Sequence, residues 1–105
     1  MNNIFRLHLL ILIFFFIFTT ISYGEKSGVK KFMDREVNEC INCDLSNLSF
    51  KHLDLTNANL TGSLLINTNF HRAILRGANF SDTEIVGANF NKADLIKTKF
   101  DNAKI

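Results

Sequence analysis

The chain has 105 residues, enough for one domain, and a formal net charge of +2. Eleven phenylalanines accompany a single tyrosine, with no tryptophan and no proline. A charge this close to zero argues against a dedicated nucleic-acid-binding protein, which needs a basic stripe, and equally against a strongly acidic surface. The two cysteines, Cys40 and Cys43, by themselves neither establish nor exclude an oxidising compartment.

Residues 1–24 have the pattern of a secretory signal peptide. One positive charge, Arg6, precedes ten unbroken apolar residues, Leu9–Phe18, and small residues at Ser22 and Gly24 match the form of a signal-peptidase site. A membrane-spanning helix needs about 20 apolar residues, more than this run offers. We therefore expect cleavage after Gly24 and an exported mature protein, periplasmic or secreted. Losing Arg6 leaves eleven Lys and Arg against ten Asp and Glu, a net charge of +1. The alternatives are an uncleaved anchor that holds the protein in the membrane and a buried core helix.

Residues 25–42 are expected to form a linker and an N-terminal cap. The first four, Glu25–Gly28, are polar, and Ser27 could cap the start of a helix. The segment Val29–Glu39 predicts a short helix, because four apolar residues stand at helical spacing: Val29, Phe32, Met33 and Val37. A helix this short is marginal in water, so it must dock on the domain that follows.

From Asp44 onward the apolar residues recur every five positions, without a helical period or an alternation of two. A small residue precedes most of them by two positions, and Asn or Asp often stands directly before them, where its side chain can bond nearby backbone in a turn. The thirteen central positions of this repeat hold only Leu, Phe or Ile: Leu45, Phe50, Leu55, Leu60, Leu65, Phe70, Leu75, Phe80, Ile85, Phe90, Leu95, Phe100 and Ile105.

Self-similarity at a fixed period indicates a solenoid. If every twentieth residue is placed in one column, three of the four columns keep their side-chain type, and the column Phe50, Phe70 and Phe90 is all phenylalanine. Stacked phenylalanines would add about 0.5–1.5 kcal/mol per pair beyond burial. Residues 43–105 would then wind into about three coils, with small residues at the alternate inward sites. Leu48 and Leu53 depart from that rule, so the first coil is expected to be wider or irregular.

The unit resembles the A-(D/N)-L-x-x repeat of the pentapeptide-repeat family over about residues 43–105. The resemblance implies an all-β solenoid: a right-handed quadrilateral β-helix with four units per coil, whose central and small residues point inward. The helical segment would then be a short N-terminal cap. The stretch CINCDLSN is also similar to the C-x-x-C-(D/N)-L-S opening of some exported members, which implies a structural role for it.

Cys40 and Cys43 form the one reactive-looking motif, with four interpretations. A thioredoxin-like dithiol needs a strand before it and a helix after it, and here the repeat follows. A zinc site lacks a second pair of ligands, since His52 and His71 fall at outward positions of the repeat. Counted in fives, Cys40 is central and Cys43 is at a small inward site, so they could close a disulfide over the first turn or remain two buried free thiols.

No other group favours chemistry. His52 and His71 are interpreted as solvated surface histidines. Asp54 and Asp94 share one face, but Ile74 lies between them in the same column, so they are interpreted as solvated repeat positions. We expect no enzyme, no cofactor, no metal, no small-molecule substrate and no nucleic acid partner.

The expected function is a small exported structural or protein-interaction module without catalytic activity, whose protein partner the sequence does not name. One alternative is a secreted effector-type binding protein. Another, implied by the resemblance, is a DNA mimic that binds a topoisomerase, but that needs a long acidic rod. Ile105 is itself a central position with nothing below it, so we also expect a homodimer through the last coil. The competing explanations are a partner protein docked there and a longer repeat.

Overall fold

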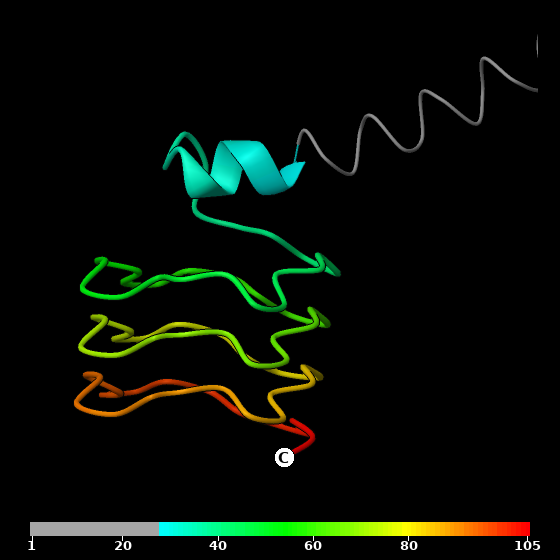
Figure 1. The fold of residues 1–105 in the computed structure, drawn as a ribbon, viewed down its shortest axis with the longest axis vertical. Helices are drawn as coiled ribbons and strands as arrows, with labels where there is room; N and C mark the ends of the chain where they lie inside the picture. The colour runs from blue at the N-terminus through cyan, green and yellow to red at the C-terminus, as the bar shows by residue number, and fades with distance from the viewer. Residues whose placement is uncertain (1–27) are drawn as a thin grey trace, which may run out of the picture.

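The computed structural model describes residues 28–105, so the predicted signal peptide and the candidate cap Ser27 lie outside the described residues. A helix over residues 28–33 stands at one end, and the rest of the chain winds into a stack of coils below it (Figure 1). No helix within residues 28–105 is long and apolar enough to cross a membrane.

The coils are joined by a parallel ladder with a period of twenty residues. Every β-bridge in the described chain pairs residues twenty positions apart, as in the series Glu39, Asn59, Asn79 and Lys99. The bridges are isolated pairs, and backbone bonds between neighbouring coils flank them: the Asn59 N–H donates to the Asn38 carbonyl at 3.0 Å. The period that the sequence columns predict is thus the period of the ladder.

A tight turn follows each central residue and forms a corner of the coil. At a typical corner the Ala78 N–H donates to the Leu75 carbonyl at 3.0 Å, and Gly77 between them has a φ of 66°. A positive φ at the third residue is the mark of a type II turn. The same left-handed position recurs every five residues: Asn42, Asn47, His52, Asn57, Gly62, Asn67, Arg72, Gly77, Asp82, Gly87, Lys92, Lys97 and Asn102.

The Asn and Asp residues that precede the central positions close these turns, as the sequence predicts. The Asn79 Oδ1 accepts a hydrogen bond from the Ser81 N–H at 3.0 Å, and the Asp54 Oδ1 accepts one from the Thr56 N–H at the same distance. Such side-chain bonds to the backbone two residues on are the usual way in which Asn and Asp favour a turn.

The core is a stack of central residues, each lying on the residue one coil away. Phe50 and Phe70 stack with ring centroids 5.3 Å apart, and Phe80 and Phe100 stack at 5.2 Å. Hydroxyl groups at small inward sites bond to carbonyls, as when the buried Thr68 Oγ1 donates to the Leu45 carbonyl at 3.0 Å. Within the described residues, no buried side-chain polar atom lacks a partner.

Central residues are buried where coils or the cap cover both sides. Ile85, Phe90 and Phe100 are partly buried and pack against the core. Leu95 and Ile105 are 40% and 97% exposed, so their assignment to the core is wrong for this chain alone, because none of its coils lies below them. The fully covered positions are Leu45, Phe50, Leu55, Leu60, Leu65, Phe70, Leu75 and Phe80.

The N-terminal cap has a shorter helix than the segment Val29–Glu39 predicts. The helix ends at residue 33, because Arg35 adopts a left-handed φ of 61°, its N–H donates to the Phe32 carbonyl, and the Glu36 N–H reaches back to the Lys31 carbonyl. These two bonds make a Schellman motif, which terminates helices. Val37 is consequently exposed, while Phe32 is fully buried against Phe50 with ring centroids 5.7 Å apart.

The two large residues at small inward sites, Leu48 and Leu53, are partly buried and pack against the core below the cap.

Candidate functional site

Cys40 and Cys43 lie between the cap and the first coil, joined by a disulfide with Cα atoms 5.5 Å apart. Cys40 is buried at its central position and Cys43 is half-buried at the small inward site. The Cys40 carbonyl accepts a hydrogen bond from the Ser63 hydroxyl at 2.6 Å, and that hydroxyl accepts one from the Cys43 N–H at 3.0 Å. The motif thus ties the first turn to the next coil and, in this form, offers no free thiolate nucleophile.

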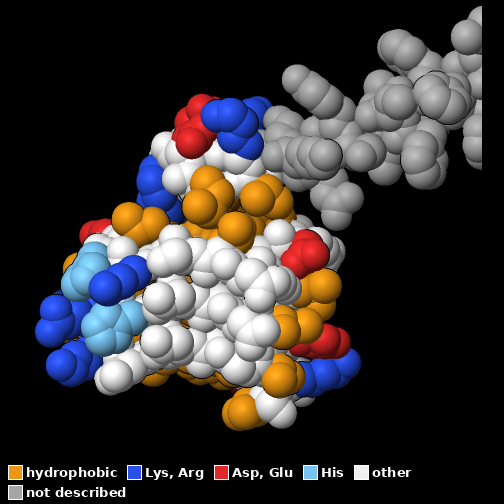
Figure 2. Space-filling view, in the orientation of Figure 1, with side chains coloured by type: hydrophobic (Ala, Val, Ile, Leu, Met, Phe, Trp, Pro, Cys, Tyr) orange, Lys and Arg blue, Asp and Glu red, His pale blue; other side chains and the backbone are white. Residues whose placement is uncertain are grey.

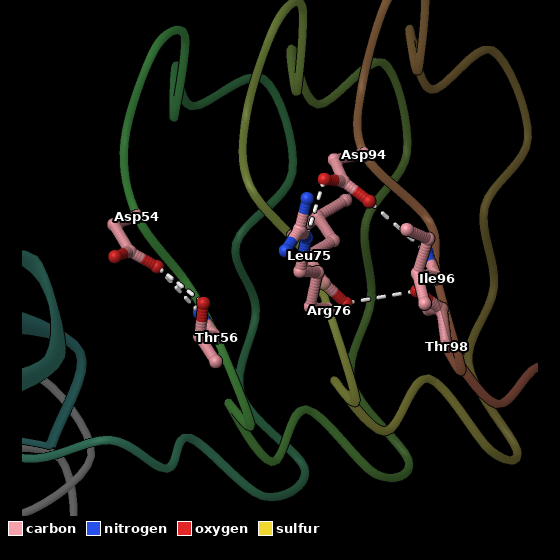
Figure 3. Close-up of polar contacts among 7 residues, drawn as sticks. All are labelled: Asp54, Thr56, Leu75, Arg76, Asp94, Ile96 and Thr98. Atoms are coloured by element: carbon pink, nitrogen blue, oxygen red, sulfur yellow. Dashed lines mark hydrogen bonds and ion pairs between the residues drawn. The ribbon is translucent and has the colours of Figure 1, made fainter.

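Asp54 and Asp94 lie in one column with Ile74 between them, because bridges join Asp54 to Ile74 and Ile74 to Asp94. The Asp54 carboxylate accepts hydrogen bonds from the hydroxyl and the N–H of Thr56 at 2.6 and 3.0 Å (Figure 3). Those bonds, chiefly the one from the hydroxyl, lower the pKa of Asp54.

Arg76 is the partner of the second carboxylate. Its Nε donates to Asp94 at 2.5 Å, and this bond lowers the pKa of Asp94 (Figure 3). A general acid must hold a proton near neutral pH, so its pKa has to be raised rather than lowered. Neither carboxylate therefore has the raised pKa of a general acid, and the side chain of Ile74 separates the two in their column.

His52 and His71 lie on the same corner of the stack, with ring centroids 6.0 Å apart in an edge-to-face arrangement. Three cationic residues surround them: Lys51, Arg72 and Lys92. Partial desolvation, and then the charges of these neighbours, lower the pKa of His71. Figure 2 shows histidine side chains beside Lys and Arg side chains at one edge of the stack.

This shared corner is a feature that the sequence interpretation missed, because it treated each histidine separately. Placing every twentieth outward residue in one column would have found it, since the ladder period sets which outward side chains meet. In residues 28–105, no group of three or more His, Cys, Asp and Glu residues is placed to hold a metal ion.

A shallow, open depression lies where the segment after the helix meets the first coil. Asp54 and Thr56 line one part of it, and Arg35 spans it by donating from its guanidinium to the Asp54 carbonyl at 2.6 Å. The remaining lining comes from Glu36, Val37 and Asn38. It is too open to enclose a small molecule, and Arg35, Asn38, Asp54 and Thr56 already bond to one another across it.

The comparisons with known proteins agree with this architecture. The pentapeptide repeat region family matches residues 38–105. A crystal structure of a pentapeptide repeat protein from the cyanobacterium Cyanothece is similar, with 28% identity, 63% of this chain and 46% of that chain covered, and a TM-score of 0.61.

A second solved structure is a pentapeptide repeat protein from the thylakoid lumen of Arabidopsis thaliana. It is 27% identical over 64% of this chain and 50% of that chain, with a TM-score of 0.43. The chain thus spans about half the length of the solved proteins it matches. No curated protein matches it.

The chain belongs to the pentapeptide repeat family, as its match to residues 38–105 shows, and the predicted resemblance is confirmed. Members of this family form right-handed quadrilateral β-helices, the architecture expected from the sequence.

Proposed function

We propose that the protein is a small exported module, a solenoid of about three coils without catalytic activity, which binds another protein through one of its flat sides. One observation carries the choice of a binding role. An aliphatic strip of outward side chains, Leu64, Ile66 and Val86, lies on one side of the stack, with Leu64 37% and Val86 52% exposed.

The side chains of these three residues are not part of the core, which is filled by the central residues on the other face of the same backbone. Glu84 and Lys104 lie in the same column as Leu64 and form an ion pair beside the strip, with Lys104 Nζ 3.2 Å from Glu84 Oε1. An apolar patch with a polar rim is the usual composition of a protein interface, and solenoids present such patches along their length.

Two further features support the proposal. The pattern of residues 1–24 favours export, and the Cys40–Cys43 pair has the geometry of a disulfide that an oxidising compartment would keep closed. Against general-acid catalysis stand the lowered pKa values of Asp54 and Asp94, and against catalysis stands the generally structural role of this family.

The test is crosslinking of the tagged protein in its native cells, followed by fractionation and capture from the envelope or the medium. Val86→Lys should lose the crosslinked partner while keeping the melting temperature, because the side chain is exposed. Ile96→Lys is the matched control, since Ile96 is a 56% exposed aliphatic residue at the same turn position in another column. Equal capture by both variants would reject the strip as the interface, and protein confined to the cytoplasm would reject export.

A further inference from the structure

One corner of the stack carries positive charge in three successive coils. It is formed by the two residues that follow Phe50, Phe70 and Phe90. Five of these six are basic, all but Asn91, and we call them the basic ridge: Lys51, His52, His71, Arg72 and Lys92. His52, Arg72 and Lys92 lie above one another at the ladder period, and the rings of Phe70 and Phe90 behind them are 5.0 Å apart. The ridge is therefore a straight row of basic residues running along the solenoid axis.

In each of these coils, the residue at the left-handed backbone position of this corner is of a type that disfavours that conformation. His52, Arg72 and Lys92 have φ values of 63°, 56° and 58°. At the left-handed positions of the other three columns the chain uses Asn, Asp or Gly, with Lys97 as the one exception in the described residues. Gly, Asn and Asp adopt that conformation far more readily than other residues do. The fold does not need these larger side chains there.

The charges of the ridge are also uncompensated within the described chain. Residues 28–105 contain three ion pairs, Lys30–Asp34, Arg76–Asp94 and Lys104–Glu84, and none of them includes a ridge residue. The residues directly before Phe50, Phe70 and Phe90, namely Ser49, Asn69 and Asn89, are uncharged. Asp54 lies on the next side, and its carboxylate accepts bonds from Thr56. Like charges in register on a ladder destabilise it.

We propose that the basic ridge binds the phosphate groups of an anionic lipid surface. The ridge is convex and exposed at Lys51, His52, Arg72 and Lys92, so it suits a flat array of anions better than a single enclosed ion. The choice of lipid rests on the proposed export, because a periplasmic chain, or one anchored by Leu9–Phe18, would lie beside a membrane. Lys and Arg near an anionic bilayer attract it over roughly one Debye length, so binding is weak, reversible and sensitive to salt.

His71 adds a dependence on pH. Desolvation, and then the charges of Arg72, Lys51, His52 and Lys92, lower the pKa of His71. When His71 takes up a proton, the ridge gains a positive charge. Binding to anionic lipid should therefore strengthen as the pH falls from about 7.5 to about 5.

Sedimentation of the mature protein with vesicles of phosphatidylglycerol or phosphatidylcholine tests the proposal at low salt. We expect binding to phosphatidylglycerol only, and a loss of at least about tenfold in affinity for Arg72→Asn with Lys92→Asn. Asn suits the left-handed positions, so this variant should melt at the same or a higher temperature. The matched control, Lys97→Asn with Lys99→Asn, removes the same charge and one left-handed lysine elsewhere, and should bind like the parent protein.

The pH arm uses His52→Asn with His71→Asn, which should abolish the gain in binding at about pH 5 and leave binding at about pH 7.5 unchanged. Equal losses for the ridge variant and its control would overturn the proposal, as would equal binding to both lipids. Binding to polyglutamate without binding to vesicles would assign the ridge to an acidic protein and reject the lipid. None of these outcomes depends on whether the cell exports the chain, so failure here and failure of export are distinguishable.

Discussion

Phe70 lies flat against Phe90, with ring centroids 5.0 Å apart and ring planes 9° apart. The two residues are twenty positions apart in the sequence, so this contact fixes the coil length and places both rings inside the stack. Phe80, in the column two along the coil and therefore on its opposite side, meets both of them edge-on at 5.5 and 5.7 Å. The aromatic core is thus a set of stacked pairs joined by edge contacts, which is the arrangement that aromatic rings prefer.

The corner positions should respond to substitution according to their left-handed φ. Gly77→Ala should lower the free energy of unfolding by about 1 kcal/mol or more, because a methyl group there is strained and would lie 2.3 Å from the Asn57 Oδ1 unless that side chain moves. Lys97→Gly, at the equivalent position one coil below, should raise the same free energy, because Gly relieves the strain. Chemical denaturation of both variants measures this, and changes of the same sign would contradict the turn assignment.

Much of this architecture could be predicted because its period is short and strict. The five-residue spacing of apolar residues such as Phe70 and Leu75 predicts which side chains point inward. The position of Asn79 directly before a central residue predicts that its side chain bonds to nearby backbone, here the Ser81 N–H. The end of the cap helix could not be predicted, because Arg35 occupies a left-handed position where Gly or Asn is the usual signal. The basic ridge was also missed, because His52, Arg72 and Lys92 meet only through the twenty-residue ladder.

The ion pair between Asp94 and Arg76 should make stability depend on acid pH. Because the pair lowers the folded-state pKa of Asp94 below its ordinary 3.8, its contribution is fully present above that value and is lost as the pH falls through the folded-state pKa. Melting curves between about pH 7 and about pH 2 should show the parent protein losing its advantage over Asp94→Asn at the acid end. A difference between the two proteins that is constant over this range would contradict the assignment.

Export and the disulfide can be tested on one sample. Protein isolated from the envelope or the medium should begin at Glu25 by mass spectrometry, and Cys40 and Cys43 should resist alkylation until a reductant is added. The physical reason is that an oxidising compartment keeps a close pair of cysteines bonded. An intact Met1 would favour the uncleaved anchor, and ready labelling without reductant would reject the disulfide in solution.

We also propose a homodimer through the last coil. Leu95 and Ile105 are exposed there, and among the described residues the N–H groups of Phe90, Leu95 and Phe100 make no backbone hydrogen bond. A second copy related by a twofold axis would cover these groups. Light scattering of the mature protein at micromolar concentration should give twice the monomer mass, and Phe100→Lys should halve it. A monomer that Phe100→Lys leaves unchanged would exclude this dimer.

The central claim is that a five-residue frame places the central side chain of each unit inside the stack and the residues directly before and after it outside. The thermal unfolding of Phe70→Asp, compared with that of Asn69→Asp and His71→Asp, tests it most directly. Phe70 is fully buried, and a buried carboxylate without a partner costs several kcal/mol, about the whole stability of a small domain. The account predicts that Phe70→Asp is unfolded at room temperature while the two flanking variants melt close to the parent protein. Equal melting temperatures for Phe70→Asp and His71→Asp would contradict it.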